Sequence, residues 1–293
     1  MKIKMQKSSN LLSAAMLALF VLAVAPGVWA TNYLWDGAAT QTPATGSDGN
    51  GTWDTSSTKW GNTTDVAWPS SPATADAAYI GQSANTAAYT ITVNQASSGI
   101  TVNNISFRDM ANYGSYTIAG SGSSGIININ PASNFTIQTG AGGTNTISAP
   151  IAGTLNSTYA FIVNRPGSTS GKLILSGANT FTPGTALGVA LRQGTVFVSS
   201  LNSVGSVTNN NGGNSANQSS SCLGAAVSGK SGIYVGYNGY LATLIYTGSG
   251  EGTDRPFTIC AGTPASGAAG TIQNDGTGPL VLAGARLYAA SLR

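Results

Sequence analysis

The sequence predicts an all-β protein built as a β-solenoid, and three observations support this class. Short apolar runs alternate with Thr, Asn and Ser at period two and recur roughly every ten residues, with Gly, Pro or Asn between them. Charged residues make up only 7% of the chain, which suits coils that stack similar side chains about 4.8 Å apart. No segment has a helical period. Many short strands also suit a β-sandwich. Units too short to close a core alone, with Asn and Thr placed to stack as ladders, favour the solenoid.

The first element, residues 1–30, is predicted to be a secretory signal peptide. Three lysines precede an apolar run over residues 11–25, and small residues lead to Ala30. Cleavage is therefore expected between Ala30 and Thr31. An uncleaved membrane anchor is the alternative, and Pro26 disfavours it. Because no other run approaches ~20 apolar residues, the mature chain is not expected to span a membrane.

Export changes the charge of the protein. The leader removes three of the twelve Lys and Arg residues and none of the nine Asp and Glu residues, so nine of each sign remain. A neutral mature chain gives no electrostatic reason to expect nucleic acid or anionic lipid as a partner. The expected location is extracellular or at the outer cell surface.

The next region, residues 31–76, is rich in Trp, Gly and Asp and is predicted to be an N-terminal cap. Its four tryptophans are Trp35, Trp53, Trp60 and Trp68. Large rings can cover the open end of a solenoid, because terminal coils need a cap. The alternative is a platform on which sugar rings stack, which would make extracellular glycans or other cell-surface components the partners. The cap is the favoured interpretation.

Residues 77–293 are predicted to form the solenoid body, with a polar low-complexity loop at about 202–221. At ~20 residues per turn the mature chain would make about a dozen coils. The stretch 171–200 is expected to supply one or more coils, with Gly and Pro at the corners. The side chains expected to point inward there are Leu173, Leu175, Val196 and Val198.

Within that stretch, "LILSGANTFTPGT" (173–185) and "RQGTVFV" (192–198) resemble the autotransporter-associated β-strand repeat. Its typical form is "LTLSGANTYTGGT" followed by a strand and "AGTLxV"; here Pro183 replaces the usual Gly. The Trp-rich opening and residues 244–262 and 270–284 also resemble parts of such secreted bacterial proteins. The specific motif residues are Leu175, Ser176, Gly177, Ala178, Asn179 and Thr180.

The resemblance implies a right-handed parallel β-helix passenger segment of an exported protein, displayed at the outer membrane or released. It implies a structural or adhesive role and no defined enzymatic activity. Members of this family often continue into further repeats and a C-terminal translocator barrel or anchor. This chain ends at "LYAASLR", so it is expected to be C-terminally incomplete; the alternative is a different mode of release.

Few residues suit catalysis. The chain has no histidine, which excludes a Ser-His-Asp triad and ordinary His-based zinc sites. Glu251 is the only glutamate, and Asp254 beside Arg255 is expected to lock a turn as an ion pair. No catalytic, cofactor-binding or metal residue is therefore assigned, and no cofactor is expected. A polysaccharide-binding or polysaccharide-cleaving β-helix is the alternative function.

Three further features have plain structural interpretations. Residues 224–231, "GAAVSGKS", fit the P-loop expression but precede a strand-like run, so a chance match in a loop rich in Gly, Ser and Ala is expected. Residues 48–54 loosely resemble a calcium loop but are expected to form an Asx-type turn. Cys222 and Cys260 are the only cysteines. Export permits a disulfide between them, and two thiols that never meet are equally consistent with the sequence.

Overall fold

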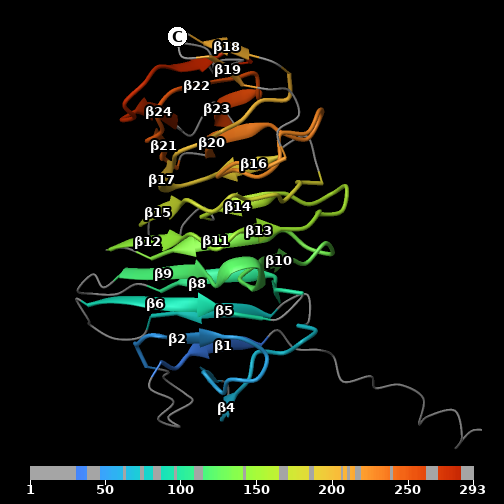
Figure 1. The fold of residues 1–293 in the computed structure, drawn as a ribbon, viewed down its shortest axis with the longest axis vertical. Helices are drawn as coiled ribbons and strands as arrows, with labels where there is room; N and C mark the ends of the chain where they lie inside the picture. The colour runs from blue at the N-terminus through green and yellow to red at the C-terminus, as the bar shows by residue number, and fades with distance from the viewer. Residues whose placement is uncertain are drawn as a thin grey trace, which may run out of the picture.

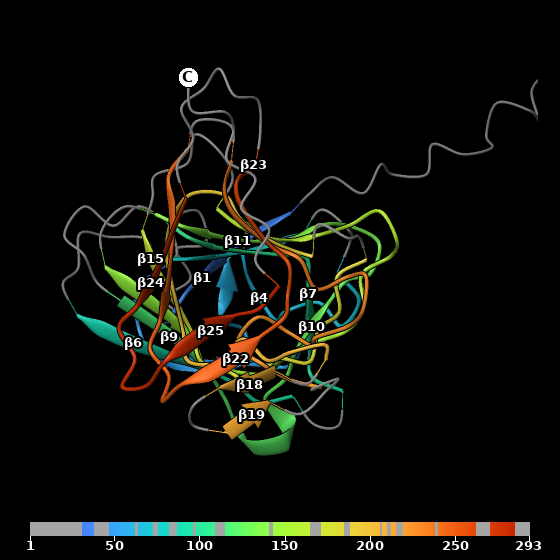
Figure 2. The same ribbon diagram turned by 90° about the horizontal axis from the view of Figure 1, so that it is seen from above.

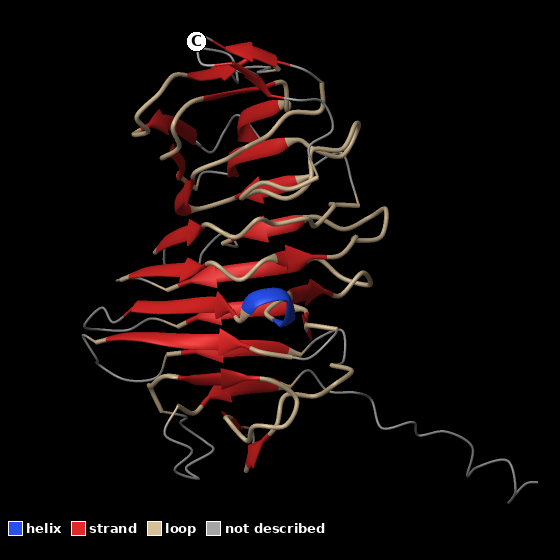
Figure 3. Cartoon of the chain, viewed as in Figure 1, coloured by secondary structure: helices blue, strands red, loops and turns tan. Residues whose placement is uncertain are grey.

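The chain folds as a stack of β-coils along one axis. The computed structural model describes residues 31–37, 47–61, 64–72, 76–81, 87–95, 98–108, 115–140, 143–164, 171–184, 188–205, 207–209, 212–214, 219–237, 240–261 and 270–284. The coils follow one another from the N-terminal end, drawn in blue, to the C-terminal end, drawn in red (Figure 1). Within the described ranges the only helix is one 3-10 turn, η1 (Gly122–Ser124) (Figure 3). The prediction of an all-β parallel solenoid is confirmed.

Two long parallel sheets and a shorter third side surround the axis (Figure 2). Sheet 1 contains β1 (Asn32–Trp35), β5 (Ala77–Ile80), β8 (Asn104–Phe107), β11 (Phe135–Thr139), β14 (Phe161–Val163), β16 (Val189–Leu191), β20 (Ile233–Tyr237) and β23 (Phe257–Ala261). Sheet 2 contains β2 (Gly51–Trp53), β6 (Ala88–Val93), β9 (Ser115–Gly120), β12 (Thr144–Ile147), β15 (Lys172–Leu175), β17 (Gly194–Val198), β21 (Ala242–Tyr246) and β24 (Gly270–Asn274).

The remaining strands complete the coils or leave the parallel pattern. Sheet 3 contains β7 (Ile100–Val102), β10 (Ile127–Ile129) and β13 (Ile151–Ala152). A separate parallel pair follows later in the chain, β22 (Glu251–Thr253) with β25 (Leu280–Leu282). The antiparallel strands are β3 (Trp60–Gly61) and β4 (Asp65–Val66) beside β1, and the hairpin of β18 (Val207–Asn209) and β19 (Gly212–Asn214).

Each turn of the solenoid is longer than the sequence predicted. The inward column of sheet 1 runs through Ala78, Ile105, Ile137, Val163, Leu191, Val235 and Ile259. Subtracting neighbouring numbers gives turns of 27, 32, 26, 28, 44 and 24 residues. The expected ~20 residues per turn and dozen coils are wrong, because each turn has three sides with a connecting loop at each corner. Six turns separate β5 from β23.

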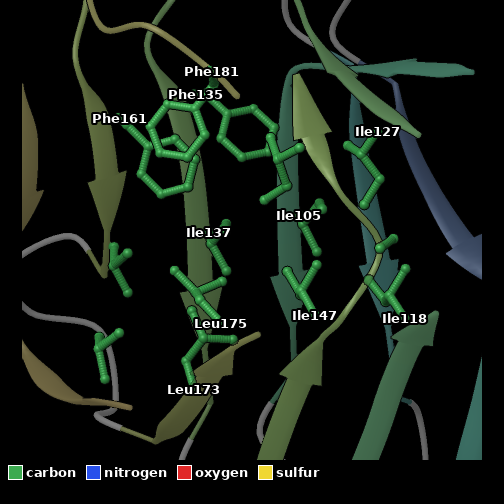
Figure 4. Close-up of a cluster of buried hydrophobic side chains, with 14 of the residues drawn as sticks. Ile105, Ile118, Ile127, Phe135, Ile137, Ile147, Phe161, Leu173, Leu175 and Phe181 are labelled. Atoms are coloured by element: carbon green, nitrogen blue, oxygen red, sulfur yellow. The ribbon is translucent and has the colours of Figure 1, made fainter. Parts of the chain in front are cut away.

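The core is a set of in-register apolar columns. The four side chains predicted to point inward are all buried: Leu173, Leu175, Val196 and Val198. Leu173 lies beside Val196 and Leu175 beside Val198 in the parallel register. Figure 4 shows buried Ile, Leu and Phe side chains of several coils gathered in the core, and the rings of Phe161 and Phe181 stack with centroids 4.1 Å apart.

Buried asparagines join successive coils where the backbone pairing between two neighbouring strands stops. Oδ1 of Asn164 accepts from the Thr139 backbone N–H at 2.7 Å, and its Nδ2 donates to the Gln193 carbonyl at 2.8 Å. Oδ1 of Asn145 accepts from the backbone N–H of Tyr116 at 2.9 Å. An amide side chain is both donor and acceptor, so it satisfies buried backbone groups on two coils at once.

Candidate functional site

The four predicted tryptophans form the Trp cap at the N-terminal end. Exposure is 0% for Trp35, Trp53 and Trp60 and 1% for Trp68. Neighbouring rings lie 4.8–5.2 Å apart between centroids in tilted or edge-on contacts. Burying rings this large stabilises the end of the core.

The alternative role of these tryptophans, a platform for stacking sugars, is wrong. A sugar must reach one face of the ring, and none of the four rings leaves a face open. Two of the indole N–H groups are also used internally: Trp35 donates to the Gly49 carbonyl and Trp68 to the Thr101 carbonyl, both at 2.9 Å.

The predicted cleavage site lies at the edge of the described residues. Ala30 falls outside them, and Thr31 is the first described residue. The backbone N of Thr31 lies 3.0 Å from Oδ1 of Asp76, a carboxylate that is 4% exposed. The Thr31 carbonyl accepts from the backbone N–H of Ala77. Both backbone polar groups of Thr31, its N–H and its carbonyl, therefore bond to residues at the start of β5.

The repeat motif forms a corner of the solenoid after β15. Within it Leu175 points into the core, Gly177 and Asn179 are buried, and Ser176, Ala178 and Thr180 are exposed. Oδ1 of Asn179 accepts from the Ile151 N–H at 2.8 Å, and Nδ2 donates to the Cys222 carbonyl at 2.7 Å.

Gly177 has a steric role in the same corner. A Cβ at this position would lie 2.7 Å from the Ala149 carbonyl oxygen, so any larger residue would push the neighbouring coil away. The motif therefore couples three successive layers of backbone, which accounts for its Gly and Asn.

Residues 199–232, here called the insertion, lengthen one turn to 44 residues and are held at their base by a later coil. The Asp254 carboxylate accepts from the Ser203 hydroxyl at 2.6 Å and from the backbone N–H groups of Val204 and Gly205 at 2.7 Å. The Glu251 carboxylate accepts from the backbone N–H of Leu201. The low-complexity part is not a plain loop, since it contains the hairpin β18–β19.

Arg255 is the buried centre of this anchor, at 0% exposure. Its guanidinium donates to the carbonyls of Leu201, Leu223 and Ser231 at 2.9–3.2 Å. Burial lowers the pKa of Arg255 to about 10, although Glu251 and Asp254 act in the opposite direction. Arg255 therefore remains charged at neutral pH.

The expected turn-locking ion pair between Asp254 and Arg255 is wrong, because the Asp254 carboxylate and the Arg255 guanidinium each bind the insertion and not each other. Sequence reasoning missed this anchor. The available signal was a cluster of three charged residues, Glu251, Asp254 and Arg255, in a chain with few charges.

Cys222 is a free buried thiol. The backbone N–H of Ser199 and the Ser200 hydroxyl both lie 3.4 Å from its Sγ. The side chain of Cys260 lies outside the described residues, although its backbone belongs to β23. The disulfide permitted by the sequence is thus not formed at Cys222 in this structure.

The weaker motif matches have structural explanations. Asp54 accepts from the backbone N–H of Ser56 at 2.8 Å, which is the expected Asx turn. Burial and the nearby Asp48 carboxylate raise the pKa of Tyr116, whose hydroxyl donates to Asp48 at 2.8 Å. The P-loop-like residues 224–231 contain a turn, with Lys230 N–H donating to the Val227 carbonyl, and lead directly into β20.

A polar groove of about 140 Å³ lies on the outer face of sheet 1. Its walls come from β1, β5, β8 and β11, and its lining residues are Asn32, Ala77, Tyr79, Asn104, Ile105, Ser106, Thr136 and Gln138. The parallel register explains the hollow. One row runs Asn32, Ala77, Asn104, and the next runs Tyr79, Ser106, Gln138. In each row a short side chain lies between two long ones.

Several polar groups of the groove have no partner within the described chain. The side chains of Tyr79, Ser106 and Gln138 make no hydrogen bond to any described residue. Oδ1 of Asn104 is buried and also lacks a partner. No charged residue lines the groove. Its chemistry is therefore that of neutral donors and acceptors beside one aromatic ring.

Comparison with known proteins gives no relative: no family model, curated protein or solved structure matches the chain. Among the described residues, no cluster of three His, Cys, Asp or Glu side chains could hold a metal ion. No helix in the described ranges has the length and apolar character to cross a bilayer.

Proposed function

We propose that this protein is an exported structural and adhesive β-solenoid, displayed at the outer cell surface or released, which acts by binding and not by catalysis. The observation that carries the proposal is the six in-register turns, whose two long sheets carry a single charged residue, Lys172, on their parallel strands. Such a body presents a fixed surface at low conformational cost on binding. The resemblance of residues 173–198 to the autotransporter-associated repeat supports the passenger-like role.

The contact between Thr31 and Asp76 supports processing of the leader. Cleavage after Ala30 would convert the Thr31 amide into an α-ammonium group 3.0 Å from a carboxylate that is 4% exposed. A charge-assisted contact of this kind is roughly twice as strong as a neutral one. Maturation would therefore strengthen the N-terminal end of the fold. Asp76→Asn should destabilise the chain that begins at Thr31 more than one extended by Ala30.

The test of the proposal combines localisation with adhesion. The full chain is expressed in a bacterial host, the cells are fractionated, and the N-terminus of the exported protein is sequenced. We expect it to begin at Thr31, and we expect the purified mature chain to bind cell surfaces. Retention of an unprocessed chain in the cytosol would contradict export. Release of new reducing ends or unsaturated products from polysaccharides would favour the cleaving alternative.

A further inference from the structure

We propose that the polar groove on sheet 1 binds one sugar unit of a neutral polysaccharide. The inference deepens the adhesive part of the proposed function and rests on it. It assigns a ligand class to a site distinct from the buried Trp cap.

The functional groups in the groove match those of a neutral sugar. The amide of Gln138 and the hydroxyls of Tyr79 and Ser106 can each donate and accept hydrogen bonds. Sugar hydroxyls have the same dual character, so neighbouring hydroxyls on a ring can satisfy both kinds of group. The Tyr79 ring is partly exposed beside them and offers an apolar face to the C–H face of a sugar. Polar groups without a hydrogen-bond partner cost free energy unless a ligand or water forms the missing hydrogen bonds.

Other ligand classes fit the groove less well. Phosphate, sulfate and nucleic acid are recognised through Lys or Arg, and none lines the groove. An added peptide strand needs a free sheet edge, whereas the groove lies on the face of strands that are paired on both sides from β5 to β11. A volume of about 140 Å³ is below the ~300–1,000 Å³ of pockets that enclose a small molecule. The groove therefore suits one ring of a longer chain lying on the surface.

The arrangement of the lining residues also fixes the direction in which the glycan would lie. The two rows of lining residues cross the strands of four successive coils, so the groove extends along the solenoid axis. Three strand spacings of ~4.8 Å give a length of about 14 Å. A linear glycan parallel to the axis would place one ring over Ala77 and Ser106, with its neighbours toward Asn32 and Gln138.

The test is calorimetric titration of the mature chain with cellohexaose, mannohexaose, maltohexaose and, as a charged comparison, hexagalacturonate. We expect at least one neutral hexaose to bind and hexagalacturonate not to bind. Tyr79→Ala and Gln138→Ala should each weaken binding about 2- to 10-fold, and the double variant about 10- to 100-fold. Ser106→Phe fills the hollow and should abolish binding while removing only one hydroxyl. Tyr234→Ala is the matched control, a partly buried tyrosine on the same outer face in β20, and should bind as the wild type does.

Three results would overturn the assignment: no neutral hexaose binds, only hexagalacturonate binds, or the folded groove variants bind as tightly as the wild type. Circular dichroism of each variant separates loss of the site from loss of the fold, and Ser106→Phe keeps the test informative if the double variant does not fold. The adhesion assay separates the two proposals. A protein that adheres equally with and without Ser106→Phe is adhesive through another surface, and the groove assignment fails alone.

Discussion

Replacing Arg255 by methionine should release the base of the insertion. The substitution keeps a long apolar stem but removes the guanidinium that donates to the carbonyls of Leu201, Leu223 and Ser231. Each carbonyl left without a donor costs about 1–3 kcal/mol, and the buried Glu251 carboxylate loses its nearby cation. Breaking a buried charged network costs about 3–5 kcal/mol in total. For a chain of this size the melting temperature should fall by roughly 6–20 °C.

The most direct assay is native-state hydrogen exchange, because solenoids need not unfold in one step. We expect backbone amides at the base of the insertion to exchange about a hundred- to a few-thousandfold faster in Arg255→Met, while amides of the Trp cap keep their protection. Arg192→Met is the matched control. The Arg192 guanidinium lies 4.5 Å from the Tyr237 ring centroid, a partly exposed contact worth about 0.5–1 kcal/mol.

The reasoning would be refuted if the insertion amides of Arg255→Met exchanged as slowly as those of the wild type. It would also be refuted if Arg192→Met lost as much protection in the insertion as Arg255→Met. Equal loss of protection in every coil would also refute it, because it would mean that Arg255 supports the whole stack and not one segment.

Three further predictions concern other parts of the fold. Burial by itself would raise the pKa of Asp254, but hydrogen bonds from the insertion outweigh burial and leave the pKa below 3.8. The stability that the Asp254 carboxylate contributes is therefore present above pH 3.8 and is lost as the pH falls through the lower pKa of the folded state. Hydrogen exchange should detect this loss, and Asp254→Asn should abolish it. Trp35→Ala should destabilise the N-terminal end by about 3–5 kcal/mol in denaturant unfolding, because the side chain is wholly buried. Asn179→Ala should cost about 1–3 kcal/mol, because the Ile151 N–H and the Cys222 carbonyl lose their partners.

Each of these has an outcome that contradicts it. Protection factors of the insertion amides that stay constant from pH 6 to pH 3 would exclude Asp254 as the anchor of the insertion. Unchanged stability of Trp35→Ala would mean that the Trp cap does not close the core. An Asn179→Ala variant no less stable than Asn156→Ala, which alters an exposed asparagine, would remove the argument that the motif couples coils.

The sequence was sufficient to predict the solenoid and its interior because both depend on local alternation. In "TITV" (90–93) every second residue is apolar, and parallel stacking puts Ile91 beside Ile118 without further information. The Trp cap was predictable for a similar reason, since four large rings within residues 31–76 can be buried most easily at an open end.

The polar groove and the anchor of the insertion could not be predicted in this way. The groove requires Tyr79, Ser106 and Gln138 to be neighbours, and they are 27 and 32 residues apart in the chain. These separations depend on the corner loops, whose lengths differ from turn to turn and carry no period. Arg255 meets Leu201 only because the insertion bends back, a path set by tertiary hydrogen bonds and not by a local pattern.

The scarcity of charge links the stability of the stack to the surface it presents. Among the parallel strands of sheets 1 and 2 only Lys172 is charged, and its neighbours in the same column are Thr144 and Thr195. A second charge of the same sign in that column would lie ~4.8 Å away and destabilise the pairing. Charges instead gather where the repeat is broken, as at Arg255. Its guanidinium can be buried there because carbonyls of the insertion accept its hydrogen bonds. The same restriction that lets coils stack thus leaves the long sheet faces with almost no charge, so a ligand held on the outer face of sheet 1 must be recognised by amides, hydroxyls and aromatic rings.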